Sequence, residues 1–223
     1  MTELTGIGYS GNILRVDLTG EKIRQEPLDE ATVKKWVGGV GLGTKYLYDE
    51  VPPGVKWSDP QNRLIWTAGP LAGTGVDGAA TVNIMAKGPM TNLAGSSQAN
   101  GFFGAYLKFC GYDGIVFQGK APHLVYLLLR RGTAEICDAR HLKGKTVSEV
   151  EETLKKELGV RKYGASVYGI GPAGENLVRF SCLMTHKHRS AGRGGGGSVL
   201  GSKNLKAIGV LGTRKVNVAD PQA

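Results

Sequence analysis

RSAGRGGGGS, residues 189–198, combines two arginines with four consecutive glycines and is the strongest local signal in the sequence. Glycine lets a backbone approach a ligand closely and turn several N–H groups in one direction. Arg189 and Arg193 flank the turn, and each guanidinium can donate two parallel hydrogen bonds to a phosphate. We interpret the stretch as an anion-binding turn that opens a helix over residues 191–202. A flexible glycine tether is the alternative interpretation.

The turn lies inside a basic segment that has no acidic residues. Residues 176–219 contain no Asp or Glu, whereas the whole chain has a formal net charge of +9. The segment holds eight basic residues: Arg179, Lys187, Arg189, Arg193, Lys203, Lys206, Arg214 and Lys215. Such a segment indicates an anionic partner, and a solvated basic face is the alternative.

Working outward from the turn, hydrophobic periodicity predicts a mixture of strands and helices. Strands are expected at residues 12–18, 22–26, 63–68, 81–86, 114–118, 124–129, 134–138, 166–170, 177–183 and 207–211. Helices are expected at residues 28–37, 44–50, 100–109 and 146–158, with Asp29 and Thr146 as N-caps and a glycine-rich break at residues 38–43. Because hairpins and crossovers are mixed and no linker stands out, we predict one domain, residues 1–223, of the α+β class.

Composition excludes several classes of protein. The 35 glycines come with only nine prolines and with 41% hydrophobic residues, which argues against collagen-like and disordered chains. The longest aliphatic run, residues 124–129, is far shorter than the ~20 residues that span a membrane. The first residues, MTELTGIGYSGN, lack the layout of a signal peptide. We therefore expect a soluble, cytoplasmic protein that does not bind membranes.

The cysteines and histidines form no recognisable site. Cys110, Cys137 and Cys182 are widely separated, so we expect small buried hydrophobic residues rather than a disulfide or a metal site. The four histidines show no HExxH or carboxylate-facing pattern, so we expect no metal ion shared by His186 and His188. The sequence therefore offers no catalytic residue and no metal ligand.

Residues 169–174, GIGPAG, match the GxGxxG pattern of dinucleotide-binding proteins directly after a predicted strand. A Rossmann unit would continue with a helix and place an acidic residue ~20 positions later. Here the sequence predicts a second strand, and the next acidic residue after Glu175 is Asp220. An NAD-dependent enzyme is therefore a minor alternative.

Four long motifs together resemble the N-terminal domain of the tungsten- or molybdenum-containing aldehyde:ferredoxin oxidoreductases. They are LIWTAGPLAGTG (64–75), NGFFGAYLKFCGYDGIVFQGKA (100–121), GIGPAGEN (169–176) and HRSAGRGGGGSVLGSKNLKAI (188–208). The resemblance implies two β-sheets related by an approximate twofold, flanked by helices and forming a saddle under a bis-pterin cofactor. It also implies that the chain is a fragment of a larger enzyme, inactive alone, whose later domains hold the ligands of a [4Fe–4S] cluster.

The resemblance further implies which residues contact the cofactor. Carried over by motif, they are Thr81, Gln98, Asn100, Arg189, Ser190, Gly192 and Arg193. Thr81 stands where some members of the family have an arginine, which removes one positive charge from the site. Backbone carbonyls of Ser190 and Gln98 occupy positions that in the family hold a Mg²⁺ ion bridging the pterin phosphates.

The leading hypothesis is thus a tungsten- or molybdenum-bis-pterin-binding domain of an oxidoreductase that oxidises aldehydes to carboxylic acids and reduces ferredoxin. Its expected partners are the remaining domains of the same enzyme, ferredoxin, the aldehyde substrate and further copies in a homo-oligomer. A basic nucleic-acid-binding module is the alternative, from the pI of about 9.5. Against it, aromatic residues are only 7% of the chain and none alternates with Arg or Lys in residues 185–206.

Overall fold

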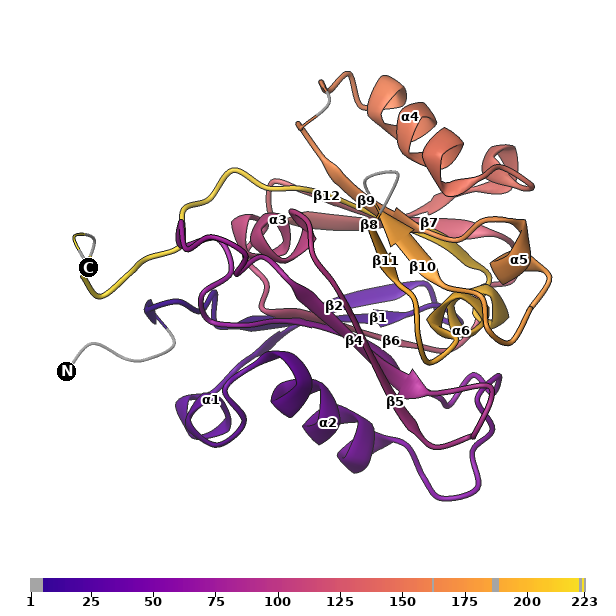
Figure 1. Cartoon of the computed structure of the whole chain (residues 1–223), viewed down its shortest axis with the longest axis horizontal. Helices are drawn as coiled ribbons and strands as arrows, with labels where there is room; N and C mark the ends of the chain where they lie inside the picture. The colour runs from indigo at the N-terminus through magenta and orange to yellow at the C-terminus, as the bar shows by residue number, and fades with distance from the viewer. Residues whose placement is uncertain (1–5, 162, 186–188, 221, 223) are drawn as a thin grey trace.

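A computed structural model describes residues 6–161, 163–185, 189–220 and 222, which form two six-stranded sheets flanked by helices (Figure 1). His186, Lys187 and His188 lie outside the described residues. The first sheet has the order β2-β1-β6-β3-β4-β5 and the second the order β11-β10-β9-β12-β7-β8. The strands of the first sheet are β1 (Asn12–Asp17), β2 (Lys22–Pro27), β3 (Leu64–Ala68), β4 (Val82–Lys87), β5 (Ala94–Ala99) and β6 (Gly114–Gln118). Those of the second are β7 (Val125–Arg130), β8 (Thr133–Asp138), β9 (Ser166–Gly169), β10 (Leu183–Thr185), β11 (Arg189–Ala191) and β12 (Leu205–Leu211).

The two sheets have the same topology. β6 pairs parallel to β1 and antiparallel to β3, and β12 pairs parallel to β7 and antiparallel to β9 in the same way. Helices fall at matching places: α3 (Phe103–Phe109) lies between β5 and β6, and α6 (Gly196–Ser202) between β11 and β12. The expected α+β fold with two related sheets is thus confirmed.

The remaining helices cover the outer faces or connect strands. α1 (Glu30–Trp36) and α2 (Gly39–Glu50) cover the first sheet, and α4 (Val147–Glu157) covers the second. A 3-10 helix (Arg140–Leu142) and the one-turn α5 (Pro172–Glu175) are connections. Within the described part of the chain, no helix is long and apolar enough to cross a membrane.

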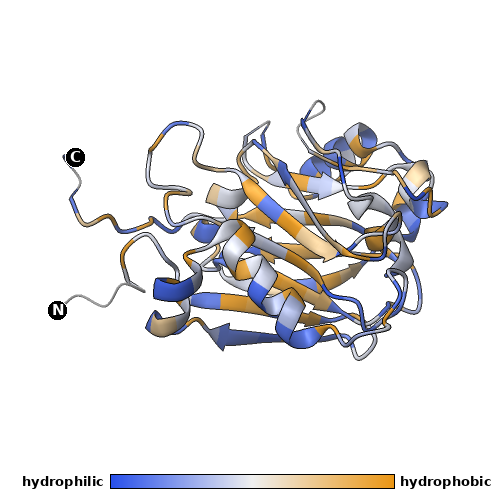
Figure 2. Ribbon diagram, turned by 60° about the horizontal axis from the view of Figure 1, so that its bottom comes forward, coloured by the Kyte–Doolittle hydropathy of each residue, from blue (hydrophilic) through white to orange (hydrophobic). Residues whose placement is uncertain are grey.

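The inner faces of the two sheets pack together and form the main core. Trp66 of β3 is fully buried and its ring contacts those of Tyr168 and Phe103 at centroid distances of 5.0 and 5.2 Å. Figure 2 shows hydrophobic segments along the strands in the middle of the molecule. Such tilted and edge-on pairs of aromatic rings add to the stabilisation from burial. The shared core therefore fixes the second sheet against the first.

Both predicted N-caps are present because their signals are local. The Asp29 side chain accepts a hydrogen bond from the Thr32 amide at 2.8 Å. Thr146 and Glu149 form a reciprocal capping box at the start of α4. From there Val147, Val150 and Leu154, spaced along one face of the helix, are buried on the second sheet as their spacing predicts.

Two predicted boundaries are wrong because glycine has another role there. The break expected at residues 38–43 is instead the start of α2. A Cβ atom on Gly41 would lie 2.3 Å from the Trp36 carbonyl oxygen, and one on Gly43 would lie 2.9 Å from Met85 Sδ. These glycines let α2 pack closely on α1 and β4. Likewise, the helix expected over residues 191–202 begins only at Gly196.

Two predictions about strands also fail. The strand expected at residues 177–183 is a turn, in which the Ser181 amide donates to the Val178 carbonyl at 2.8 Å, and β10 begins only at Leu183. β5, with the sequence AGSSQA, was not predicted, because small and polar residues on an edge strand give no hydrophobic alternation.

Of the three cysteines, only Cys110 is buried, whereas Cys137 and Cys182 are partly exposed, and all three are free.

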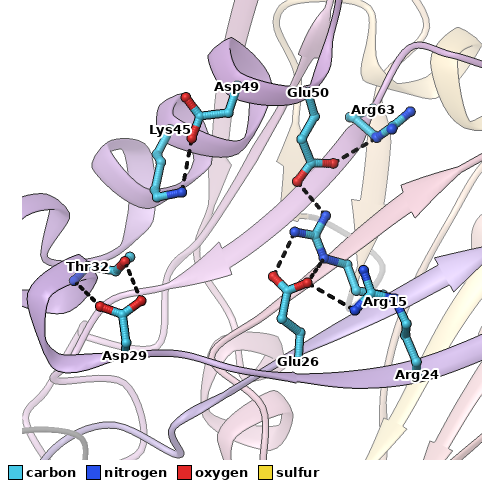
Figure 3. A network of polar contacts seen from close by, with 9 residues as sticks. All are labelled: Arg15, Arg24, Glu26, Asp29, Thr32, Lys45, Asp49, Glu50 and Arg63. Carbon is cyan, nitrogen blue, oxygen red and sulfur yellow. Dashed lines mark hydrogen bonds and ion pairs between the residues drawn. The ribbon is translucent and has the colours of Figure 1, made fainter.

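A network of charges holds the outer face of the first sheet together (Figure 3). The Arg15 guanidinium lies 2.7 Å from Glu26 and 2.6 Å from Glu50, and Glu50 in turn lies 2.9 Å from Arg63. Burial opposes ionisation of Glu26, but its hydrogen bonds and charge interaction with Arg15 lower its pKa overall. Each of these carboxylates forms an ion pair with arginine. The network therefore stabilises the fold and is not an acid–base pair.

Lys203, at the end of α6, is buried and ties the two halves of the chain together. Its Nζ atom donates to the carbonyl oxygens of Gly119, at 3.1 Å, and Pro60, at 3.4 Å. Burial and the nearby Arg63 lower the pKa of Lys203 to about 7, against the opposing effect of Asp17. The amine therefore binds a proton more weakly in the folded chain than in the unfolded chain.

This difference predicts how stability depends on pH. Above pH ~7 the unfolded chain holds more protons at Lys203 than the folded chain, so the free energy of unfolding rises with pH until the unfolded lysine titrates near ~10.4. Lys203→Met should flatten that rise between about pH 7 and 8.5. Denaturant unfolding of both proteins across this window is the measurement, and equal slopes would contradict the prediction.

Candidate functional site

The edge strands β5 and β11 lie next to each other, which brings two glycine-rich segments together. The backbone N–H of Arg193 donates to Ser97 Oγ at 3.2 Å. A Cβ atom on Gly88 would lie 3.0 Å from the Gly194 carbonyl oxygen, so the turn after β11 also lies against the β4–β5 hairpin. The junction of the two sheets is thus built from the segment singled out in the sequence and from an unpredicted strand.

A second group of candidate residues lies at the end of β5. The Thr81 hydroxyl donates to Asn100 Oδ1 at 2.7 Å and lies 3.3 Å from the Gly78 carbonyl oxygen. Gln98 is exposed on β5 and pairs with Asn83 of β4. Thr81 and Asn100 are therefore brought together directly, with Gln98 two positions before Asn100 on the same strand end.

The remaining candidates lie on β11 and the turn that follows. Arg189 and Ser190 pair with Thr185 and Met184 of β10, and both are exposed, as are Gly192 and Arg193. Among the described residues, no direct hydrogen bond joins either arginine to Thr81, Gln98 or Asn100. The link between the two groups is Ser97, which sequence reasoning missed because a serine on an edge strand carries no distinctive pattern.

Arg189 and Arg193 have no carboxylate partner among the residues that the structure describes. Arg15 and Arg63 are paired, whereas Arg189 and Arg193 are exposed and have no ion pair. An exposed guanidinium without a carboxylate partner can donate charge-assisted hydrogen bonds to an anion. The charges of Arg189 and Arg193 are thus available to a ligand.

The basic segment, residues 176–219, exposes fewer of its charged side chains to a partner than the sequence suggests. Lys203 and Lys206 are buried, and Lys206 pairs with Glu175 and donates to the Lys145 carbonyl at 2.8 Å. Lys187 lies outside the described residues. Two of the eight basic residues of the segment are therefore not available to an anionic partner.

The glycines of the turn serve different purposes. A Cβ on Gly195 would lie 2.2 Å from the Arg179 carbonyl oxygen, and one on Gly197 would lie 2.6 Å from that of Cys182. Gly194 has a positive φ of 76°, which favours glycine. Gly192 has neither constraint, since only Ser190 Oγ, at 3.4 Å, would meet its Cβ. Close approach of a ligand would account for a glycine there.

The anion-binding role expected for the helix start is not supported. α6 has only seven residues and its first turn is buried, with the Gly197 amide donating to the Ser181 carbonyl at 3.1 Å. Between the turn and β5 lies a cavity of about 10 Å³, enough for at most one water molecule. A larger ligand would therefore lie across the exposed edge rather than between the strands.

The GxGxxG segment does not form a dinucleotide site. The one-turn α5 does follow the glycines, contrary to the predicted strand, but β9 pairs antiparallel with both β10 and β12. A Rossmann unit needs parallel strands joined by a full helix. Instead, Glu175 of this segment is held by Lys206 and the Gly144 amide, so the segment supports the second sheet.

In the described residues, no group of three or more His, Cys, Asp or Glu side chains is placed to hold a metal ion.

Comparisons with known proteins agree on one family. A family model for "Aldehyde ferredoxin oxidoreductase, N-terminal domain" matches residues 13–212. The "Tungsten-containing aldehyde ferredoxin oxidoreductase" of Pyrococcus abyssi is 46% identical over 213 residues, which cover 96% of this chain and 35% of that protein. The "Aliphatic sulfonate oxidoreductase, WOR-like subunit" of Pyrococcus furiosus is 42% identical over 216 residues, covering 90% of this chain and 34% of that protein.

A solved structure is also closely similar. It is the "Active site complex BamBC of Benzoyl Coenzyme A reductase in complex with 1,5 Dienoyl-CoA", with a TM-score of 0.93 and 42% identity. The match covers 97% of this chain and 33% of that chain. The chain thus spans about a third of the length of the relatives that it matches, which are oxidoreductases.

Proposed function

The chain belongs to the aldehyde ferredoxin oxidoreductase family, and from this premise we propose that it is a single cofactor-binding domain for a tungsten- or molybdenum-bis-pterin. The observation that carries the proposal is the pair of exposed, unpaired arginines, Arg189 and Arg193, beside a glycine that nothing in the described chain requires. A bis-pterin with phosphate groups is a large, flat anion. It fits an open, basic edge better than a closed pocket.

Each candidate residue has a role suited to its chemistry. Arg189 and Arg193 bind phosphate or pterin oxygens through forked hydrogen bonds, and Gly192 lets the cofactor approach the backbone. Thr81, Gln98 and Asn100 supply uncharged hydrogen bonds from the end of β5. The carbonyl oxygens of Ser190 and Gln98 are available to a Mg²⁺ ion, which prefers oxygen ligands and phosphates.

The protein's contribution is positioning and charge. The metal and its sulfur ligands, when bound, supply the oxidation of the substrate and the transfer of electrons. This chain holds the cofactor by its phosphates and ring edges against the paired sheet edges. The rest of the polypeptide would cover the cofactor, carry a [4Fe–4S] cluster and form the substrate channel.

We propose that the whole protein oxidises aldehydes to carboxylic acids, passes the electrons to ferredoxin, works as a homo-oligomer in the cytoplasm and is inactive when reduced to this chain. The tungsten-containing relatives named for aldehydes and ferredoxin support this activity. The relative named for aliphatic sulfonates makes the substrate class the point to test.

The test is to purify the full-length protein under anaerobic conditions and measure its tungsten, molybdenum and pterin contents. Aldehyde-dependent reduction of ferredoxin is then assayed, with an aliphatic sulfonate as the competing substrate. Metal and pterin together with aldehyde oxidation would support the proposal. Protein without pterin, or tight DNA binding that weakens steeply with salt, would overturn it in favour of the nucleic-acid alternative.

A further inference from the structure

The internal repeat makes the two groups of candidate residues equivalent in position. Asn100 precedes the first residue of α3, Phe103, by three positions, and Arg193 precedes the first residue of α6, Gly196, by three positions. In each segment the next residue is a glycine with positive φ, 138° at Gly101 and 76° at Gly194. We call residues 97–102 the first half-site and residues 190–195 the second half-site.

Serines provide a second check on this equivalence. Ser97 stands six positions before the first residue of α3, and Ser190 stands six positions before that of α6. Ser97 Oγ accepts the Arg193 amide at 3.2 Å, so the first half-site directly supports the second. The two half-sites are therefore neighbouring copies of one arrangement.

The charges of the two half-sites are unequal. The second half-site carries Arg193 and follows directly on Arg189, both exposed and without an ion pair in the described part of the chain. The first half-site has Asn100 at the position of Arg193, and its neighbour Thr81 is also uncharged. A guanidinium makes charge-assisted hydrogen bonds, which are about twice as strong as those of a neutral amide.

The neutral half-site is nevertheless organised for hydrogen bonding. Because the Thr81 hydroxyl donates to Asn100 Oδ1, the amide group of Asn100 is oriented with its NH₂ turned away from Thr81. Phe102 takes the position that Gly195 has in the other copy, is 39% exposed, and packs edge-on against Tyr163 at a centroid distance of 5.8 Å. A neutral amide donor suits an uncharged ring edge better than it suits a phosphate.

We propose that the two half-sites hold the two pterin units of the cofactor unequally. The second half-site binds its unit through ionic contacts to phosphate, and the first half-site binds its unit through neutral hydrogen bonds. This inference rests on the proposed function. It implies that the salt dependence of cofactor retention comes from one half-site only. It also implies that exchanging Arg193 and Asn100 by mutation moves the positive charge, and the ionic contact, to the other half-site.

The experiment exchanges the two equivalent residues in the full-length protein. Wild type, Asn100→Arg, Arg193→Asn and the double exchange variant are purified with cofactor. Each is then kept at sodium chloride concentrations from about 0.01 M to about 1 M, where the screening length falls from about 30 Å to about 3 Å. Tungsten and pterin that remain bound are measured over time. Arg130→Asn is the matched control, because it removes one exposed positive charge from the β7–β8 hairpin and none from either half-site.

We expect Arg193→Asn to lose cofactor about tenfold faster than wild type at low salt and to depend less on salt than wild type, because only Arg189 remains as a cation there. Asn100→Arg should retain cofactor longer than wild type and depend more steeply on salt. The double exchange should return retention to within about threefold of wild type, since it moves the charge to the equivalent position. Arg130→Asn should leave both cofactor retention and its salt dependence as in wild type. All positions are wholly or partly exposed, so circular dichroism and thermal unfolding serve to confirm the fold.

Two results would overturn the inference while leaving the proposed function intact. One is cofactor loss that is equally sensitive to salt in all four proteins. The other is a double exchange variant that retains cofactor as poorly as Arg193→Asn, which would mean that the half-sites are not equivalent. Wild-type protein without pterin would instead overturn the proposed function, and the inference with it.

Discussion

Replacing both Arg189 and Arg193 by alanine is expected to remove most of the tungsten and pterin from the full-length protein and to leave its fold intact. Both side chains are exposed and have no ion pair among the described residues, so the folded chain loses little when they are truncated. Such surface changes usually alter stability by no more than about 0.5 kcal/mol. The proposed cofactor, in contrast, would lose its contacts with the two cations that flank Gly192 in the sequence.

The measurement is the tungsten and pterin content per polypeptide, with thermal unfolding as the test of the fold. Arg130→Ala/Arg131→Ala removes the same charge from the exposed β7–β8 hairpin and serves as the control. The control variant should keep its cofactor. Full metal occupancy and activity in the Arg189→Ala/Arg193→Ala variant would refute the assignment of the site.

The second large effect concerns stability, at the buried pair of Lys108 and Asp113. Lys108 Nζ lies 3.0 Å from Asp113, and their side chains are 0% and 1% exposed. Asp113 also accepts the backbone amides of Ser10, at 3.0 Å, and Gly11, at 2.7 Å. Asp113→Ala would strand a buried ammonium and leave two amides unpaired, which costs about 3–5 kcal/mol. We expect the unfolding temperature to fall by roughly 10 °C.

Asp113→Asn is the control, because it keeps an oxygen for the backbone amides and removes only the charge. It should lie between wild type and Asp113→Ala. Burial lowers the pKa of Lys108, whereas Asp113 acts against that shift. Without Asp113 the pKa falls further below that of the unfolded chain, so the stability of the alanine variant should rise with pH more steeply than that of wild type. Alanine and asparagine variants with wild-type unfolding temperatures would contradict this account.

Local signals explain why much of the fold could be predicted. The caps at Asp29 and Thr146 depend on residues three positions away, and alternating hydrophobic residues mark strand β1. β5 could not be predicted, since its small polar residues are held in place by pairing with β4 and by contact with β11. The glycines at the start of α2 were wrongly predicted to break the helix. They are needed there because Trp36 of α1 and Met85 of β4 pack too closely to leave room for a side chain.

For the site, sequence reasoning identified residue types but could not identify their surroundings. Lys203 and Lys206 look like the neighbouring arginines in the sequence, yet they are buried and bonded within the chain. The hydrogen bond from the Arg193 amide to Ser97 joins residues 96 positions apart, so no local sequence pattern predicts it. Burial and long-range contacts are properties of the fold, so only the structure separates the two available arginines from the two buried lysines.

The order of strands also has a consequence for synthesis of the protein on the ribosome. Every strand pair joins strands of the same half, residues 12–118 or residues 125–211, so the first sheet can form before the second has been translated. On its inner face Trp66 contacts Phe103 of the first half, and the packing around it is completed only when Tyr168 of the second half has been translated. Part of an apolar surface therefore stays exposed on the nascent chain while residues 119–168 are translated. Chaperone binding should concentrate in that interval, and quenching of Trp66 fluorescence marks its end.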